Sequence, residues 1–300
     1  MQSSEQARPG WLKAAPAIFL LLWSSGFVFL KLGLAFADPL TFLALRYALV
    51  LAVVLPLVLW LRPAWPREAG VWGHLAVIGL LLQAGYFSLT YVSLDAGMSA
   101  GGIALITSQQ PILVGLLAPW VAGERVAPVR WLGLALGVAG ACLVVVAKSG
   151  GATATQWLAW AWAGLALLAL TSGTLWEKRF GRSDVHPGVS NLVQYATGLL
   201  TVLPLAVWLE PLRVQWAAPG LWYALAYLVL ANSLVAMTLL LAMIRWGEAA
   251  RVSALFFLVP PATAVIAALV LGEHIPALAW AGMLLAVIGI FLVTRQRAVS

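Results

Sequence analysis

Two adjacent amide side chains lie in the middle of an otherwise apolar segment of this sequence. Residues 106–124 read ITSQQPILVGLLAPWVAGE, in which Gln109 and Gln110 directly precede Pro111. An amide both donates and accepts hydrogen bonds, and its burial without a partner costs about 2–7 kcal/mol. These side chains therefore need a polar partner, which is either a neighbouring helix or a bound small molecule.

Other polar and aromatic residues share this central position in their apolar segments. Gln83, Tyr86 and Thr90 follow the spacing of one helix face, and so do Thr107 and Gln110. Two interpretations stand side by side: the hydroxyls bond to carbonyls of their own helix and the amides join helices, or the residues line a substrate-binding cavity. The expected cavity residues are Trp23, Ser24, Phe27, Gln83, Tyr86, Thr90, Thr107, Gln110, Thr174, Trp176, Asn232 and Phe257.

Proline lies at the centre of two apolar segments. Pro111 cannot donate a hydrogen bond to the carbonyl of Thr107, and Pro260 cannot donate to that of Phe256. We expect each helix to be kinked or softened there, either as a fixed bend or as a moving hinge.

Charged residues lie near the ends of the apolar segments. Lys31, Arg46, Lys178 and Arg179 are expected at the mouths of the cavity, where they meet a substrate carboxylate or anchor the helix ends. No basic residue is expected at mid-depth, which disfavours nucleotide sugars and lipid phosphates as substrates.

The same distribution disfavours catalysis. All ten Asp and Glu residues lie at segment ends or in loops, so no carboxylate is placed for a proton relay within the membrane. The three histidines are scattered, and Cys142 is the single cysteine. We therefore expect no catalytic residues, no metal and no cofactor.

The segments that carry these residues are long enough to cross a bilayer. The chain has 300 residues, of which 63% are hydrophobic and only 9% are charged. Crossing about 30 Å of hydrocarbon takes about 20 residues of α-helix. We expect an all-α integral membrane protein with ten spans, at 16–36, 41–61, 73–94, 99–121, 129–147, 157–177, 188–209, 219–244, 249–271 and 277–294.

Positive charge sets the expected orientation. Thirteen of the 17 lysines and arginines fall on the side that holds both termini, which predicts that both termini are cytoplasmic. This orientation explains the net charge of +7. We expect the lipid bilayer as a partner and no nucleic-acid partner.

The sequence repeats itself. A shift of 149 residues places Pro111 on Pro260, and a shift of 148 places Tyr47 on Tyr195. Because each repeat holds five spans, an odd number, the two copies are inverted in the membrane, which favours alternating access around a site at the midplane. The expected division is a tail at 1–15, repeats at 16–147 and 157–294, a linker at 148–156 and a tail at 295–300.

Small residues mark the last span of each repeat. Gly133, Gly137 and Gly140 correspond to Gly282, Ala286 and Gly289, which predicts close packing of these two spans. We expect this packing within one chain rather than between two, and hence a functional monomer.

Several segments together resemble a known family. They are WSSGFVFLK (23–31), DPLTFLALRYAL (38–49), YVSLDAGMSAGGIALITSQQP (91–111) and AGERVAPVRWLGLALGVAGACLVV (122–145). The chain is similar to the EamA-type family of the drug/metabolite transporter superfamily, and among its members to bacterial exporters of aromatic amino acids. The resemblance implies ten helices, residence in the inner (cytoplasmic) membrane, and export of amino acids or related metabolites through a central cavity.

The chain also departs from that pattern. The family arginine is present as Arg46, but its counterpart in the second repeat is Gln194. The first span lacks the membrane glutamate of the small multidrug proton antiporters, so a facilitated exporter is expected.

The sequence thus predicts an exporter that works by alternating access. A zwitterionic amino acid is expected at mid-depth, its amine near aromatic faces and its carboxylate near Gln83, Gln110 or Asn232. The alternatives are a nucleotide-sugar, lipid-phosphate or drug carrier and, from other classes, a membrane enzyme or a structural membrane protein.

Overall fold

The computed structural model describes residues 14–122, 128–148, 154–180, 185–236, 239, 243 and 249–295. Within these residues the chain is helical, and the one β-type feature is an isolated bridge between Ala37 and Val214. The all-α prediction is confirmed. The elements are α1 (Ala15–Gly33), α2 (Pro39–Leu61), α3 (Ala69–Ile78), η2 (Gly79–Tyr86), α4 (Phe87–Asp95), α5 (Ala100–Thr107), α6 (Gln110–Ala122), α7 (Pro128–Lys148), α8 (Ala154–Phe180), α9 (Pro187–Leu209), α10 (Pro219–Ala226), η3 (Tyr227–Ala236), α12 (Ala249–Leu271) and α13 (Ala277–Arg295).

Six helical stretches are long and apolar enough to cross a membrane. They are Ala15–Gly33, Pro39–Leu61, Ala69–Asp95, Ala154–Glu177, Pro187–Leu209 and Pro219–Ala236. Shorter apolar helices follow at Ala100–Val114, Trp131–Val144, Leu258–Leu271 and Ala277–Leu292. All of these coincide with segments that the sequence marks as spans, and the chain is a multi-pass membrane protein.

Proline sets the start of several helices. Pro39, Pro187 and Pro219 each occupy the first position of their helix, where the missing N–H has no intrahelical partner to lose. Pro39 and Pro187 are related by the internal repeat, so the repeat fixes where α2 and α9 begin.

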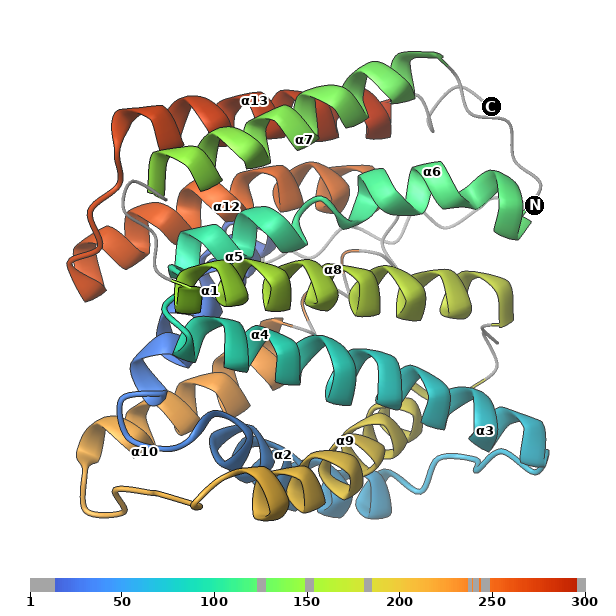
Figure 1. Cartoon of the computed structure of the whole chain (residues 1–300). Helices are drawn as coiled ribbons and strands as arrows, with labels where there is room; N and C mark the ends of the chain where they lie inside the picture. Colours follow the sequence, from blue (N-terminus) through green and yellow to red (C-terminus); the bar gives the residue numbers. More distant parts are fainter. Residues whose placement is uncertain are drawn as a thin grey trace.

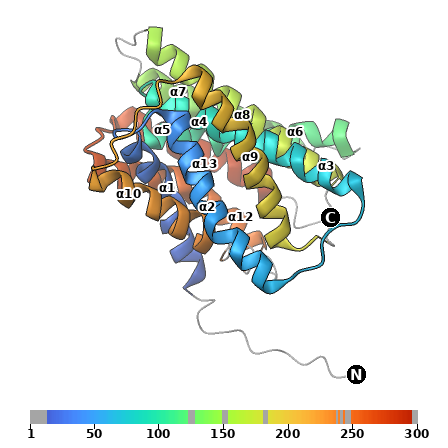
Figure 2. The ribbon, with the colours of Figure 1, turned by 90° about the horizontal axis from the view of Figure 1, so that it is seen from below.

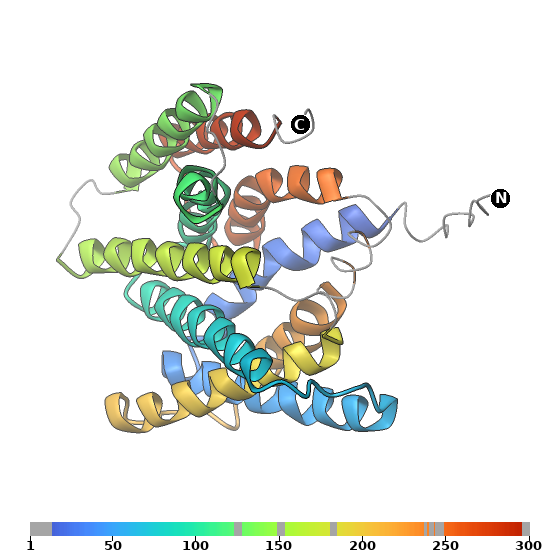
Figure 3. The same cartoon turned by 90° about the vertical axis from the view of Figure 1, so that its right-hand side faces the viewer.

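The helices lie side by side in layers (Figure 1). The α7–α13 pair forms the top layer and the α2–α9 pair the bottom, and α2 and α9 lie next to each other when seen from below (Figure 2). In Figure 3, α1 and α8 run through the middle of the molecule between these pairs. Helix α1 packs on α12 and η3, and α8 packs on α4, η2 and α6, so the first helix of each repeat lies against the other repeat.

The α7–α13 pair approaches at backbone contact distance. A Cβ atom on Gly140 would lie 2.4 Å from the carbonyl oxygen of Gly282, and one on Gly289 would lie 2.5 Å from that of Gly133. Glycine is therefore required at these positions, and the predicted packing of the last spans within one chain is confirmed.

The two central prolines have different effects on their helices. The fourth span is interrupted just before Pro111, because α5 ends at Thr107 and α6 begins at Gln110. Helix α12 continues through Pro260 without a break, so a break beside the central proline is found only in the first repeat, and the kink expected at Pro260 stays a prediction.

Wider π-helical turns occupy the centres of the third and eighth spans. Element η2 contains Gln83 and η3 contains Asn232, and these residues correspond under the 149-residue shift. π-Helical turns often mark functional positions in helices.

Candidate functional site

Arg46 of α2 lies at the centre of a buried polar cluster, although its side chain carries a full positive charge. It is 2% exposed. Its Nη1 donates to Tyr91 Oη at 3.2 Å, and its Nη2 donates to Ser233 Oγ at 3.0 Å and to Asn232 Oδ1 at 3.3 Å. Its Nε has no hydrogen-bond partner. The guanidinium carbon lies 5.0 Å from the centroid of the Phe87 ring.

The position of Arg46 bears on two expectations. Arg46 is seven residues inside α2, about 10 Å from the start of the helix, and its buried side chain reaches Asn232. A basic side chain thus lies beside Asn232, the residue that the sequence places at mid-depth. This contact weakens the argument against substrates that carry phosphate.

Asn232 joins η3 to α1 beside Arg46. Its Nδ2 donates to the carbonyl oxygen of Leu22 at 3.3 Å, while its Oδ1 accepts from Arg46. Gly26 allows this approach, because a Cβ atom there would lie 2.4 Å from Asn232 Nδ2. Asn232, placed at mid-depth from the sequence, is thus one of the groups that hold the arginine.

Tyrosines from both repeats surround the cluster. The phenols of Tyr47, Tyr91 and Tyr195 lie within electrostatic range of Arg46. Tyr47 Oη donates to the carbonyl oxygen of Gln83 at 2.6 Å, and the rings of Tyr47 and Tyr195 meet edge to face at 5.5 Å. These three tyrosines were not among the site residues expected from the sequence. The coincidence of Tyr47 and Tyr195 under the repeat shift was the signal that pointed to two of them.

A second group gathers where η2, α4 and α5 meet. Gln83 and Tyr86 are each 8% exposed, and Gln83 Oε1 has no hydrogen-bond partner. The Tyr86 hydroxyl faces those of Thr107 and Thr90, but Thr90 Oγ1 makes no hydrogen bond of normal geometry. Thr107 Oγ1 donates to the carbonyl oxygen of Ile103 in its own helix at 2.9 Å, which is a common arrangement for threonine within a helix.

The two adjacent amides face different helices. Gln110 Nε2 donates to Thr174 Oγ1 of α8 at 2.8 Å. Gln109 packs towards α7, because a Cβ atom on Gly137 would lie 2.6 Å from Gln109 Oε1. Successive residues of a helix point about 100° apart, so adjacent amides do not share one face. Of the two, only Gln110 is directed towards α8, which runs through the middle of the molecule.

Two expected aromatic residues pack in other clusters. Trp176 Nε1 donates to His74 Nδ1 at 3.0 Å, and the Trp176 ring packs on Phe180, so this tryptophan belongs to a cluster at the end of α8. The Trp23 ring lies 5.4 Å from that of Phe19 and packs against a separate small core. Position along a helix indicates the depth of such a ring only approximately, because a long side chain reaches a full turn along its helix.

Among the remaining expected residues, the structure describes the side chains of some and not of others. Ser24 is fully buried and its Oγ has no partner. Phe27 packs against the small cluster of Val28, Ala100 and Ala267 and also against the main core, which contains Tyr47 and Tyr91. The side chains of Phe257 and Lys178 lie outside the described residues.

Lys31 and Arg179 lie at helix ends, as expected. Lys31 Nζ donates to Glu273 Oε1 at 2.7 Å and to the carbonyl oxygen of Met98 at 3.0 Å. The exposed Arg179 lies with its guanidinium carbon 5.4 Å from the centroid of the Phe180 ring.

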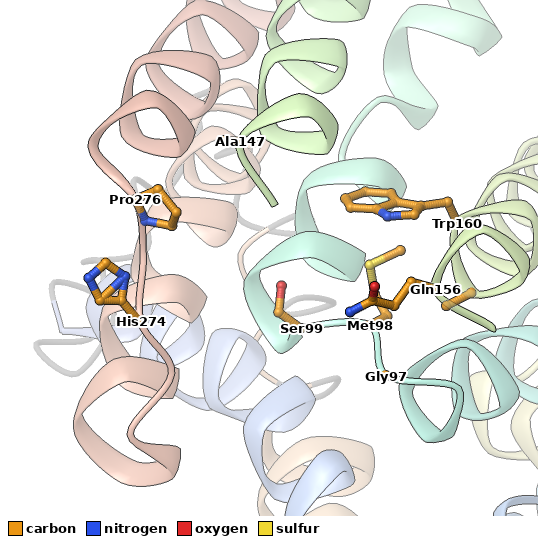
Figure 4. Close-up of a pocket in the computed structure, with 9 residues that line it drawn as sticks. Gly97, Met98, Ser99, Ala147, Gln156, Trp160, His274 and Pro276 are labelled. Atoms are coloured by element: carbon orange, nitrogen blue, oxygen red, sulfur yellow. The ribbon is translucent and has the colours of Figure 1, made fainter. Parts of the chain in front are cut away.

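Two cavities open at the end of the bundle that carries Lys31. One has a volume of about 320 Å³ and lies between α5, the start of α8 and the linker before α13 (Figure 4). Met98, Ser99, Gln156, Trp160 and His274 contribute to its lining. The other has a volume of about 450 Å³ and is bordered by the α1–α2 linker, Asp95 and residues 213–215.

Comparison with known proteins agrees with this architecture. The EamA-like transporter family matches residues 14–146 and 157–295, which are the two sequence repeats. An uncharacterised transporter of Bacillus subtilis (strain 168) is 28% identical over 94% of this chain and 91% of its own length. A probable amino-acid metabolite efflux pump of Salmonella typhimurium is 26% identical over 92% of each chain, and one of Escherichia coli (strain K12) is 24% identical over the same shares.

A solved structure shares the fold. This crystal structure, described only as that of a protein, superposes with a TM-score of 0.63 over 95% of this chain and 98% of its own, at 18% identity. The family match covers both repeats, and the names of the relatives indicate a transporter rather than an enzyme. The chain belongs to the EamA-like transporter family of membrane proteins.

Proposed function

We propose that this protein exports amino acids, with aromatic and other bulky apolar ones favoured, by alternating access around the buried cluster at Arg46. The observation that carries the proposal is that both repeats contribute to the cluster. Arg46, Tyr47 and Tyr91 come from the first repeat, and Tyr195 and Asn232 from the second. A site built from both halves changes its access when one half moves against the other.

The composition of the cluster suits such a substrate. Aromatic rings line it, the side chain of Asn232 adds a hydrogen-bonding group, and Tyr47 links the cluster to the backbone of Gln83. Two relatives named as probable amino-acid metabolite efflux pumps support the same substrate class. The proposal includes ten spans with both termini in the cytoplasm, residence in the inner membrane, and function as a monomer.

Facilitated rather than proton-coupled transport fits the contacts of Arg46. They are all to neutral groups, so within the described residues no carboxylate shares the cluster to carry a proton. Proton transfer by membrane transporters generally uses such buried acidic groups.

Counterflow tests the proposal directly. Purified protein in proteoliposomes loaded with unlabelled phenylalanine should accumulate labelled phenylalanine, tryptophan and leucine from outside. Replacing Asn232 with Ala should reduce the initial rate, whereas replacing the exposed Gln215 at the end of the bundle should not. Absence of counterflow for every amino acid, with the protein folded, would show that the substrate class is wrong.

A second candidate is a carrier of nucleotide sugars or other phosphate-bearing metabolites. The buried Arg46 favours it, because a guanidinium binds phosphate as well as carboxylate. Counterflow with a nucleotide sugar, run beside the amino acids, separates the two functions.

A further inference from the structure

We infer that Arg46 is the specificity-determining residue that binds the anionic group of the transported molecule, which is the carboxylate when the substrate is an amino acid. This inference rests on the proposed function for the position of the site. It adds a chemical requirement that the proposed function alone does not contain. A molecule that lacks an anionic oxygen group should not be transported.

In the part of the chain that the structure describes, Arg46 has no counter-charge. Every hydrogen bond that it makes goes to a neutral acceptor, at 3.0–3.3 Å. Hydrogen bonds from arginine to an anion are usually shorter, about 2.7–2.9 Å. Within the described residues no Asp or Glu pairs with this guanidinium. A buried charge is normally paired, because its desolvation is costly. The buried guanidinium therefore offers a positive charge with which an anionic group of a ligand can pair.

Arg46 also has a free donor. Its Nε is buried and has no partner. A guanidinium offers parallel N–H groups that match the two oxygens of a carboxylate. One oxygen of a substrate carboxylate can accept a hydrogen bond from Nε. The other oxygen can replace Asn232 Oδ1 as the acceptor of the long hydrogen bond from Nη2. The face of Phe87 holds the guanidinium in place meanwhile.

The two repeats differ at this position. The counterpart of Arg46 in the second repeat is Gln194, whose Nε2 donates to Ser190 Oγ at 2.9 Å in its own helix. Of these two equivalent positions, only the one in the first repeat thus carries a cation. A ligand with one anionic end is held in a single orientation by such a site, and its apolar end faces the surrounding aromatic rings.

The test compares ligands that differ only in charge. In wild-type counterflow, phenylalanine should compete with labelled phenylalanine, and phenylalaninamide should compete at least about tenfold less well, as expected for the loss of one charged hydrogen-bond partner. Phenyl phosphate is the third competitor and separates a carboxylate site from a phosphate site. Arg46→Gln should abolish the preference for the acid over the amide, and Arg46→Lys should retain part of it. Arg213→Gln is the matched control, because this arginine is exposed in a linker.

The outcomes separate this inference from the proposed function. If amino acids are transported and Arg46→Gln still prefers the acid to the amide, the inference is overturned and the proposed function stands. If the wild-type protein binds phenyl phosphate but transports no amino acid, and Arg46→Gln loses that binding, the proposed function fails and the anion site stands.

A binding measurement covers the case in which the Arg46 variants do not fold. The melting temperature of the wild-type protein should rise with phenylalanine or phenyl phosphate and not with phenylalaninamide. An equal rise with the amide would overturn the inference without any variant.

Discussion

Lys31 and Glu273 form an ion pair between the two repeats, with Nζ and Oε1 2.7 Å apart. The same lysine donates to the carbonyl oxygen of Met98, and the same carboxylate oxygen accepts from the backbone N–H of Ala100. The pair therefore fastens the end of α1 to the start of α5 and to the linker between α12 and α13. Lys31 lies nine residues beyond Leu22, which contacts Asn232, or about 13 Å along α1.

Breaking this ion pair should open one end of the bundle. Alternating access requires the helices around Arg46 to separate at that end, and Glu273→Gln removes the charge that holds them. We expect a cysteine at Val28, which is buried against Ala100 and Ala267, to react faster with a maleimide in the Glu273→Gln variant. The measurement uses purified protein in which Cys142 is replaced by Ser.

The control is a second link at the same end. Asp38 and Arg213 lie 3.9 Å apart at their side chains, but backbone hydrogen bonds also join their linkers. Asp38→Asn removes the charge of that pair and leaves most of those bonds, so its labelling rate at position 28 should match that of the parent. Equal labelling rates in both variants would contradict a gating role for Lys31 and Glu273.

A methyl group at Gly26 should displace Asn232 from the cluster. The added Cβ atom would lie 2.4 Å from Asn232 Nδ2, and such overpacking typically costs about 1–3 kcal/mol. We expect Gly26→Ala to lower the melting temperature and to raise the KM for phenylalanine, since Asn232 also holds Arg46. Gly70→Ala is the control, because nothing lies within 4 Å of the added atom. An unchanged KM in Gly26→Ala would separate Asn232 from substrate binding.

The α7–α13 contact predicts a purely structural effect. Gly140→Ala places a Cβ atom 2.4 Å from the backbone oxygen of Gly282, so the two helices must move apart. Gly164→Ala in α8 meets nothing within 4 Å, and alanine is a better helix former than glycine by about 1 kcal/mol. The melting temperature should fall in the first variant and stay the same or rise in the second. A fall of the same size in both would show that this contact does not stabilise the fold.

The sequence predicted the helices well because apolar length and proline position are local properties. The second span, expected at 41–61, is found as α2 at Pro39–Leu61, and the close packing expected for the last span of each repeat is found at Gly140 and Gly282. The position of the Arg46 side chain could not be predicted in this way, because a long side chain can reach either way along its helix. Its partners in η3 also lie 186 and 187 residues further along the chain.

The hydrogen-bond partners of the central side chains could not be predicted from the sequence either. Helical spacing gives the face of a residue, but the helix that the face meets depends on the tertiary arrangement. The hydrogen bond of Trp176 to His74 brings together α8 and α3, which no local pattern relates. Gln110 could be assigned to mid-depth, but its bond to Thr174 could not be foreseen.

Gln110 has two candidate roles, joining two helices and binding substrate, and these can be tested separately. Its Nε2 donates to Thr174 Oγ1 at 2.8 Å, so the two side chains should be coupled in stability by about 0.5–1.5 kcal/mol, the usual net value of a hydrogen bond. Melting curves of Gln110→Leu, Thr174→Val and the double variant measure this coupling, since the double variant should lose less than the sum of the single ones.

Transport by the same three proteins decides the role. Gln110 lies in α6, whereas the proposed anion site is built by α2, α4 and η3, so removing the amide should leave the ratio of rates for phenylalanine and leucine unchanged. A changed ratio in Gln110→Leu that is absent from Thr174→Val would mean that the amide contacts the substrate. The bond to Thr174 would then be the contact that holds the amide in place between binding events.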